Sequence, residues 1–349
     1  MVSPGLRNHG GNHELTRLAL RSVNTTVALL SAERDRLSLL TGQRLLGFSP
    51  ALLSTVMSLT IADYRRFYAD EIRFVANLDS PALVEAFARV PREQFIGPGP
   101  WRVGSAEVRA LAAAGMGRAT YVPVDDPRHL YHNVVVVLDA ARDINNGQPS
   151  ALAHWINGLQ LQPGNRVYHL GCGVGYYTAI MAEVVGPDGS VVGTEIDPEL
   201  AKRAQANLAS YANVEVHTAD GGEFDPGECD AMLINAGVTH PHPLWLDRLR
   251  EGGRLVLPIT LATSETLGAG LMTKIVRRSN GFSAHGITPV GIYSCKSVRD
   301  PELELLVRRA FTTQAILGVR SLRREPHEED ETCLVHGKGV CFSSAELSE

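Results

Sequence analysis

Apolar residues in the first part of the chain recur at spacings of three and four, the period of an amphipathic helix. The recurrence runs from Glu14 to about Asn77, and the pair Ser49-Pro50 marks one helix start within it. Residues 1–13 are polar and rich in glycine, so we expect them to be disordered. The pattern predicts an N-terminal helical extension over residues 1–79, made of two to four helical segments.

The next eighty residues show a less regular pattern, in which apolar runs are short and are interrupted by glycine, proline and charged residues. The predicted elements are a helix from Ser80 to about Phe95, irregular chain over 102–133, a strand over 134–138, a polar loop over 143–149 and a helix over 150–159.

From Gly164 onward, short β-branched runs alternate with stretches of helical period. This alternation predicts an α/β fold with a doubly wound, mostly parallel sheet. After Pro258 the pattern changes to hairpin-like strands, then a helix and further strands, so residues 297–349 form a C-terminal α+β extension to a core domain of 80–296. The predicted strands are 166–170, 190–195, 213–217, 229–235, 253–258, 270–277, 282–287, 290–295, 315–320 and a terminal pair at 332–342, with helices at 175–185, 198–209, 243–250 and 300–314.

Composition narrows the class of protein. A net charge of −5 over 349 residues is unfavourable for a general nucleic-acid binder, which needs many exposed cations. The five cysteines are odd in number and scattered, which favours a reducing compartment over a disulfide scaffold. No apolar run is long enough for a membrane span, and the N-terminus lacks an apolar signal core. We therefore expect a cytoplasmic protein that binds neither nucleic acid nor membrane.

A glycine turn joins the strand at 166–170 to the following helix and carries the clearest chemical signal. Gly171, Gly173 and Gly175 are spaced Gly-x-Gly-x-Gly, which differs from the Gly-x-Gly-x-x-Gly that admits a dinucleotide pyrophosphate. A nicotinamide dehydrogenase therefore fits poorly. The tighter spacing is the one with which S-adenosylmethionine enzymes let the amino-acid part of the cofactor lie on the chain.

The ends of the next three strands supply suitable partners for an adenosyl group. Glu195 follows the second strand at the distance expected of a carboxylate that accepts from both ribose hydroxyls. Asp220 follows the third strand and can accept from the exocyclic adenine amine, while Gly221 leaves room for the ring. Asn235 ends the fourth strand. Ligands in such sheets lie beyond the carboxyl ends of the strands, so these residues are predicted to lie together.

These stretches resemble the protein-L-isoaspartate O-methyltransferase family of the class I S-adenosylmethionine-dependent methyltransferases, over residues 80–296. The resemblance implies a Rossmann-like methyltransferase fold and methyl transfer to a carboxylate, with S-adenosylhomocysteine as product. It also implies a cofactor-binding site lined by Gly171, Gly173, Glu195, Asp220 and Gly221. Besides the glycine turn, the matching stretches are 90–95 (VPREQF), 175–180 (GYYTAI), 220–221 (DG), 230–234 (DAMLI) and 251–258 (EGGRLVLP).

Two departures separate the chain from the repair enzymes of that family. Their Thr-Ile-Ser-x-Pro loop is replaced by Asn145-Asn146-Gly147-Gln148-Pro149, so Gly147 stands where a serine hydroxyl touches the substrate. Asn146 and Gln148 in that loop are candidates for acceptor contacts. His169 occupies the position of an acid near the ammonium group of the cofactor, where a neutral imidazole accepts a hydrogen bond but a protonated one repels.

Three functions remain open from the sequence. The first is O-methylation of a carboxylate on a peptide or protein, which needs no base because the acceptor is ionised near pH 7; loss of the serine favours a modified peptide, such as a ribosomally made natural product. The second is O- or N-methylation of a small metabolite, with His240 and His242 as candidate catalytic bases. The third is a non-catalytic binding or scaffold protein, and any of them allows a homodimer through the N-terminal helices.

A metal site is not expected. Cys333, His336 and Cys341, with His327 or Cys295 as a further partner, have a spacing that matches no common zinc finger or knuckle. We therefore interpret this segment as a terminal hairpin.

Overall fold

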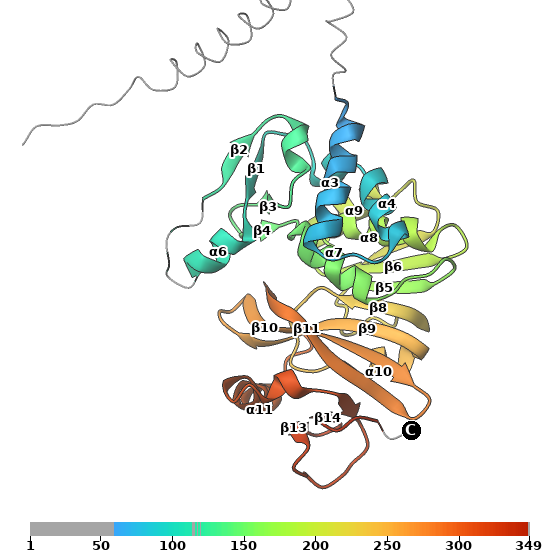
Figure 1. Ribbon diagram of the computed structural model, residues 1–349, viewed down its shortest axis with the longest axis vertical. Coiled ribbons are helices and arrows are strands. Elements are labelled where there is room, and N and C mark those ends of the chain that lie inside the picture. Colours follow the sequence, from blue (N-terminus) through green and yellow to red (C-terminus); the bar gives the residue numbers. More distant parts are fainter. Residues whose placement is uncertain (1–58, 114–115, 117, 119, 348–349) are drawn as a thin grey trace, which may run out of the picture. The chain divides into compact units, whose positions relative to one another are not determined.

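The computed structural model describes residues 59–347, apart from 114, 115, 117 and 119 (Figure 1). The chain divides into two units, residues 1–58 and 59–349, and every described residue belongs to the second. The disorder expected for residues 1–13 and the helical segments expected before residue 59 therefore lie outside the described residues. The described part of the N-terminal extension holds helix α3 (Ile61–Val75), which begins at a capping box between Thr60 and Asp63.

A ten-stranded sheet forms the centre of the second unit, in the order β7-β6-β5-β8-β9-β10-β11-β12-β14-β13. The strands from β7 to β9 are parallel to their neighbours, and all pairings beyond β9 are antiparallel. The strands are β5 (Arg166–Leu170), β6 (Ser190–Glu195), β7 (Val214–Thr218), β8 (Cys229–Ile234), β9 (Leu249–Ala262), β10 (Leu267–Arg278), β11 (Gly281–Tyr293), β12 (Ser321–Arg323), β13 (Cys333–Gly337) and β14 (Val340–Ser343).

Helices cover both faces of the parallel strands, which confirms the doubly wound α/β class (Figure 1). Alternate residues of each strand point to opposite faces, so Val167 and Leu233 pack in one hydrophobic core and Tyr168 and Met232 in the other. The first core holds α3, α4 (Pro81–Arg89), α7 (Pro149–Gly158), α8 (Tyr176–Val185) and α9 (Pro198–Asn207), and the second holds α10 (Pro243–Arg248) and α11 (Pro301–Thr312).

A second, four-stranded sheet lies beside the large one, with the order β2-β1-β3-β4 (Figure 1). The prediction of irregular chain over 102–133 was wrong, because this segment contributes two strands and two short helices to that sheet region. Its strands are short and pair only with distant partners, so no local period announces them. The elements are α5 (Arg92–Ile96), β1 (Trp101–Gly104), α6 (Ala106–Ala113), β2 (Val122–Val124), η1 (Pro127–Leu130), β3 (Val135–Asp139) and β4 (Ile144–Asn145).

The C-terminal part differs from the prediction in two places. The two strands expected at 282–287 and 290–295 are one strand, β11, which has a bulge opposite Met272 and Thr273. The strand expected at 315–320 is a 3₁₀ turn, η2 (Ala315–Gly318), after which β12 begins. The terminal pair is confirmed as β13 and β14, and β12 and β14 join the large sheet rather than forming a separate layer.

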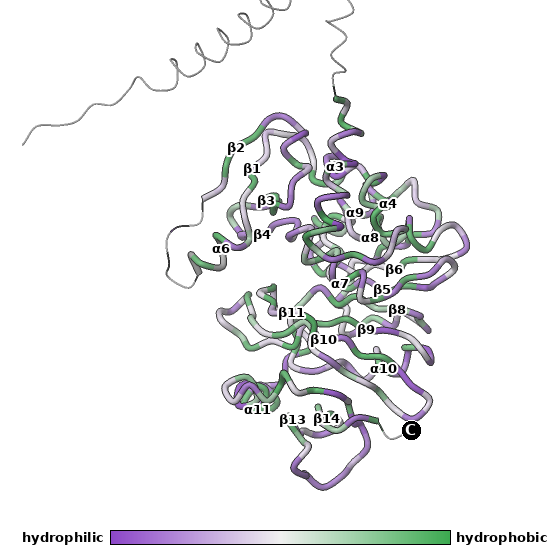
Figure 2. The backbone as a smooth tube through the Cα atoms, in the orientation of Figure 1, coloured by the Kyte–Doolittle hydropathy of each residue, from purple (hydrophilic) through white to green (hydrophobic). Residues whose placement is uncertain are grey.

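The hydropathy of the chain follows this arrangement (Figure 2). β8 is almost entirely hydrophobic and buried, whereas the loop between β12 and β13 is hydrophilic. None of the described helices has the length and apolar character needed to cross a lipid bilayer.

Candidate active site at the carboxyl edge of the parallel strands

The strand order reverses at β5. From β5 the chain continues to β6 and β7 on one side, and then returns to place β8 and β9 on the other side. Ligands of doubly wound sheets bind where the order reverses, beyond the carboxyl ends of the strands. The glycine turn follows β5, Glu195 ends β6, Asp220 follows β7 and Asn235 follows β8, so the structure brings the predicted cofactor residues to one edge of the sheet.

The glycine turn needs its glycines for two different reasons. All three have positive φ, at +73° for Gly171, +57° for Gly173 and +88° for Gly175. A Cβ on Gly175 would lie 2.6 Å from Leu208 Cδ1, and one on Gly171 would lie 3.1 Å from the carbonyl oxygen of Asn235. A Cβ on Gly173 would meet no atom within 4 Å. Gly171 and Gly175 are therefore required by packing, whereas Gly173 presents bare backbone to open space, as a ligand-binding turn must.

Glu195 is attached directly to this turn. Its Oε2 accepts a hydrogen bond from the Gly173 backbone N–H at 2.8 Å, and its Oε1 accepts one from the Asp197 N–H at 3.1 Å. The side chain is only 7% exposed, and burial raises the pKa of the carboxyl while the backbone donors oppose that shift. Each carboxylate oxygen keeps a further lone pair, so the group can still accept from a diol.

Asp220 is held by a segment that the sequence analysis did not connect with it. Its Oδ1 accepts from the Gly222 N–H at 3.0 Å and from the Ser297 hydroxyl at 2.5 Å. Ser297 lies between β11 and α11, so the C-terminal extension contributes to this corner of the site. Among the residues that the structure describes, Oδ2 of Asp220 has no hydrogen-bond partner, which leaves it available to a donor such as an amine.

Gly221 has a different role from the one predicted. A Cβ at this position would lie 2.3 Å from Leu170 Cδ1 and 2.7 Å from the Tyr168 hydroxyl oxygen. The carbonyl of Gly221 accepts hydrogen bonds from Tyr168 and from Trp245 Nε1. The side-chain space at Gly221 is thus filled by the protein core and does not provide room for an adenine ring; any cofactor contact here is to backbone.

Asn235 contacts the glycine turn, and His169 lies on β5 two residues before it. The Asn235 amide donates to the Gly171 carbonyl at 3.2 Å and so connects the end of β8 to the turn. His169 is fully buried, and its Nδ1 lies 2.9 Å from the Thr178 hydroxyl of α8. Burial lowers the pKa of His169 to about 3, so the imidazole is neutral at pH 7. Its Nε2 is buried and has no partner among the described residues.

The loop after β4 contacts the first turn of α8, the helix that follows the glycine turn. The Tyr177 hydroxyl of α8 donates to the Gly147 carbonyl at 3.4 Å. Arg142, in the turn between β3 and β4, forms ion pairs with Asp139 and with Asp197, whose backbone N–H donates to Glu195 Oε1. Gly147 has a φ of +71°, and a Cβ there would lie 2.9 Å from Leu152 Cδ2. A serine at this position would be strained by the positive φ and would require the end of the Leu152 side chain to move.

Asn146 and Gln148 are placed differently from each other. Asn146 is 8% exposed, and its side-chain nitrogen is buried without a hydrogen-bond partner among the described residues. Gln148 precedes α7 and donates from Nε2 to Glu107 of α6 at 2.6 Å. The Gln148 side chain is thus held by α6, whereas the side-chain nitrogen of Asn146 keeps an unused donor within this loop.

His240 and His242 follow the end of β8, and Thr239 beside them contacts the segment that leads into α11. Nδ1 of His242 accepts from the Leu244 N–H at 3.3 Å and caps α10. Nδ1 of His240 lies 2.9 Å from the hydroxyl of Thr239, which also accepts from the Asp300 N–H. Burial lowers the pKa of both rings. Nδ1 of His242 thus caps a helix and Nδ1 of His240 contacts Thr239, and the role of the two histidines as bases stays a prediction.

Sequence reasoning missed three residues that organise the site. Arg142 connects the β3–β4 turn to Asp197, and Ser297 connects the C-terminal extension to Asp220. Arg92 is fully buried and donates to the carbonyls of Leu130 and Val134, which holds the segment leading into β3. Only Arg92 had a signal, because it belongs to the VPREQF stretch.

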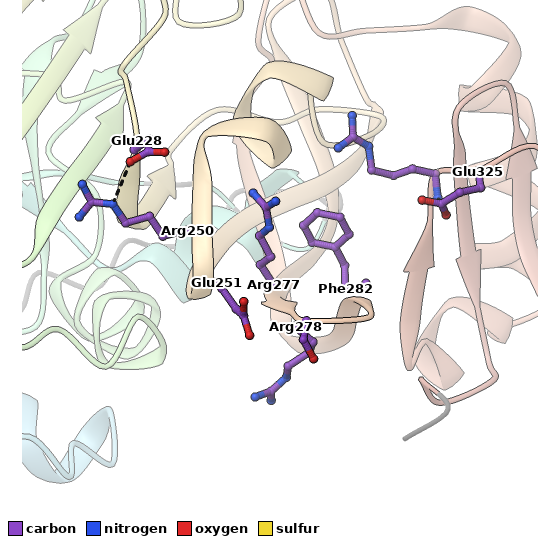
Figure 3. A pocket seen from close by; sticks show the side chains of 10 residues that line it. Glu228, Arg250, Glu251, Arg277, Arg278, Phe282 and Glu325 are labelled. Atoms are coloured by element: carbon purple, nitrogen blue, oxygen red, sulfur yellow. Dashed lines mark hydrogen bonds and ion pairs between the residues drawn. The ribbon is translucent and has the colours of Figure 1, made fainter.

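A cavity of about 440 Å³ lies elsewhere on the molecule (Figure 3). Arg250, Arg277 and Phe282 line it, together with Glu228, whose carboxylate is 3.5 Å from Arg250. Glu228 and Arg250 stand at the amino ends of β8 and β9, the opposite edge of the sheet from the glycine turn. This cavity is therefore not the predicted cofactor site.

A doubly wound sheet with a Gly-x-Gly-x-Gly turn at its reversal point and carboxylates after the next two strands defines a Rossmann-like class I methyltransferase. A family model described as protein-L-isoaspartate(D-aspartate) O-methyltransferase matches residues 102–282, just over half of the chain. The chain belongs to this family and is an S-adenosylmethionine-dependent methyltransferase.

Individual relatives agree with the family assignment. The protein-L-isoaspartate O-methyltransferase of Ignicoccus hospitalis is 32% identical over 52% of this chain and 85% of its own length. That of Methanothrix thermoacetophila is 34% identical over 54% of this chain and 78% of its own length. A solved protein-L-isoaspartate O-methyltransferase structure matches with a TM-score of 0.52 at 21% identity, over 73% of this chain and 72% of the other, which shows a shared fold.

Proposed function

We propose that this protein transfers a methyl group from S-adenosylmethionine to a carboxylate of a peptide or protein and releases a methyl ester. The observation that carries the proposal is the hydrogen bond from Gly173 to Glu195 at the reversal point of the sheet. This bond joins two parts of the proposed site. The exposed backbone at Gly173 would contact the amino-acid part of the cofactor, and the Glu195 carboxylate would accept from its ribose hydroxyls. In this assignment Asp220 accepts from the adenine amine through its unused oxygen.

When bound, the sulfonium of the cofactor supplies an electrophilic methyl group. The residues of the chain contribute binding, alignment and the exclusion of water. An acceptor carboxylate is already ionised near pH 7 and needs no base. Neutral His169 suits this arrangement, because it places no positive charge beside the cofactor ammonium. The structural contacts of His240 and His242 are also those expected where no base is required, and their role as bases stays a prediction for a hydroxyl or amine acceptor.

The acceptor side of the proposal concerns the loop from Asn145 to Gln148. Gly147 offers no hydroxyl, and its positive φ of +71° disfavours a residue with a side chain at this position. We propose that the buried Asn146 amide replaces that contact and that the backbone around Gly147 faces the acceptor. Such a loop favours an acceptor other than the aged protein of the repair enzymes, and a modified peptide is our specific proposal.

Methylation of a small metabolite and a purely non-catalytic binding role are not favoured by any feature of the described residues. We propose a cytoplasmic location, which is supported by five cysteines that are all free thiols. Dimerisation through residues 1–79 remains a prediction, because residues 1–58 lie outside the described chain.

The test is methyl transfer from a labelled donor to a panel of peptides that contain aspartyl, isoaspartyl or amidated residues. A carboxylate acceptor gives a product that releases labelled methanol in mild base, and a Glu195→Ala variant gives less product at a donor concentration below its Kd. Label that stays on the product in base shows transfer to nitrogen or to a hydroxyl and contradicts the proposal.

A further inference from the structure

Four potential metal ligands meet at the edge of the sheet farthest from the predicted active site. His327 lies in the loop between β12 and β13, Cys333 and His336 lie on β13, and Cys341 lies on β14. One ligand atom from each residue lies within 4.8 Å of those of all the others. The loop and the hairpin therefore bring together two thiols and two imidazoles, a donor set that selects zinc among the common metals.

The distances suit a tetrahedral ion. Sγ of Cys333 is 3.6 Å from Nε2 of His327. In a tetrahedral site with Zn–S of about 2.3 Å and Zn–N of about 2.0 Å, sulfur and nitrogen stand about 3.5 Å apart. His336 and Cys341 face each other in the register of the hairpin, and the two imidazole rings lie 4.7 Å apart at 82°. The four ligands need only a small contraction to close around one ion.

The hydrogen bonds around the cluster orient it for metal binding. Nδ1 of His327 lies 2.8 Å from the carbonyl oxygen of Glu325, so Nδ1 must carry the proton and Nε2 directs its lone pair toward Cys333. Imidazole ligands of zinc typically donate their other N–H to a carbonyl in this way. The Asp330 N–H donates to Sγ of Cys333 at 3.4 Å, as backbone amides do toward metal-bound thiolates. Nδ1 of His336 is buried without a partner among the described residues.

A metal-free hairpin core and a disulfide each account for fewer of these contacts. A simple hairpin core accounts for buried Cys341 but not for the orphaned nitrogen of His336. A disulfide between Cys333 and Cys341 does not explain why both histidines point at the two thiols, and both cysteines are free thiols. The nearby acid Asp330 is already paired with Arg323 at 2.9 Å, so two thiolates would balance the charge of one divalent ion.

We propose that His327, Cys333, His336 and Cys341 bind a structural zinc ion. Four protein ligands make a closed site, which attaches the acidic loop before β13 to the β13–β14 hairpin and does not take part in methyl transfer. The spacing His-x5-Cys-x2-His-x4-Cys matches no common finger, which is why the sequence analysis expected no metal. The loop brings His327 back to the hairpin, and spacing alone does not reveal that return.

The first test measures zinc in the full-length protein, purified without a histidine tag, by mass spectrometry of the metal after gel filtration. We expect about one zinc per chain. Cys333→Ser and His336→Gln each lower the content severalfold or more. Two matched controls outside the cluster, Cys229→Ala on β8 and exposed His129→Gln, keep the wild-type content. A wild-type protein that holds no zinc after loading with the metal and gel filtration contradicts the proposal.

The second test keeps the proposal falsifiable where a variant fails to fold. The wild-type protein, freed of metal by a chelator under reducing conditions, is titrated with cobalt(II). A tetrahedral site with two thiolates gives intense visible bands and a sulfur-to-cobalt charge-transfer band, saturating at about one equivalent. Weak octahedral bands overturn the assignment, and so does a peptide linking Cys333 to Cys341, lighter by two hydrogen atoms, in a digest of the protein as isolated. Methyl transfer is not needed for either readout, so this proposal stands or falls independently of the proposed function.

Discussion

The backbone N–H of Gly173 donates a 2.8 Å hydrogen bond to Oε2 of Glu195, across two neighbouring parallel strands. The bond joins the one glycine of the turn that faces open space to the carboxylate that ends β6. Both partners follow paired strands of the sheet, so the proposed cofactor site is built on rigid elements.

Gly173 tests whether the open side of the turn is a binding surface. In Gly173→Ala the new methyl group meets no protein atom, but the backbone φ of +57° is unfavourable for alanine. We expect this strain to lower the free energy of unfolding by about 1–2 kcal/mol. The methyl group also occupies the space proposed for the cofactor. We expect the Kd for S-adenosylhomocysteine, measured by calorimetry, to rise at least about tenfold, the equivalent of about 1.4 kcal/mol.

Gly164→Ala is the matched control. Gly164 also has a positive φ, +83°, and a Cβ there would likewise meet no atom within 4 Å, but this glycine lies in the turn before β5. Its variant should lose similar stability with unchanged affinity. Equal affinities for the two variants would show that Gly173 does not border the cofactor.

Asp220 is expected to recognise the adenine amine. In Asp220→Asn the carboxylate is replaced by an amide of the same size, and loss of one hydrogen bond to a charged group is about 1.5–3 kcal/mol. The affinity for S-adenosylhomocysteine should therefore fall at least about tenfold. The affinity for the inosine analogue, which lacks the amine, should change little. An equal loss for both ligands indicates that Asp220 acts only through its bond to Ser297.

His169 makes the stability of the fold depend on pH. Burial lowers its pKa from 6.5 to about 3, so between these pH values the imidazole is protonated in the unfolded chain but stays neutral in the folded chain. Its stabilising contribution is complete above pH 6.5 and declines as the pH falls toward 3. Between pH 7 and pH 5.5, urea titrations should show the wild type losing about 1 kcal/mol more than His169→Asn. Parallel pH dependence in the two proteins would mean that His169 is not the group responsible.

Substitution of His240 and His242 distinguishes a carboxylate acceptor from a hydroxyl or amine acceptor, which needs a base. His242→Asn keeps a side-chain acceptor for the Leu244 N–H, and His240→Gln keeps a polar group beside Thr239. With a carboxylate acceptor we expect kcat/KM within about twofold of wild type and an unchanged pH profile, because no proton is removed. His242→Ala should lose about 1 kcal/mol of stability through the lost helix cap, with kcat/KM retained. A fall in kcat of about a hundredfold or more in either variant would establish a base.

The alternating part of the chain could be predicted closely from the sequence. The bounds expected for β5 and β6 coincide with those observed, because buried parallel strands and amphipathic helices each leave a clear local period. The proposed cofactor residues Gly173, Glu195 and Asp220 could be brought together from the sequence for a related reason. Every parallel strand ends at the same edge, so residues after successive strands must come together.

The remaining features depend on contacts between distant segments. β1 and β2 are too short for a period, and only their pairing defines them. Ser297 reaches Asp220 across 77 residues, and Gly221 is a glycine because Leu170 and Tyr168 fill its side-chain space. His327 returns to the β13–β14 hairpin through a loop without regular structure. None of these relationships has a signature within a short window of sequence.

Calorimetric titration with S-adenosylhomocysteine of the wild type, Glu195→Ala and the exposed neighbour Glu199→Ala tests the proposed site most directly. We predict stoichiometric binding to the wild type and to Glu199→Ala, and at least about tenfold weaker binding to Glu195→Ala, because the ribose loses its carboxylate acceptor. A folded wild-type protein that binds none of this ligand, or a Glu195→Ala variant that binds as tightly as wild type, would contradict the account.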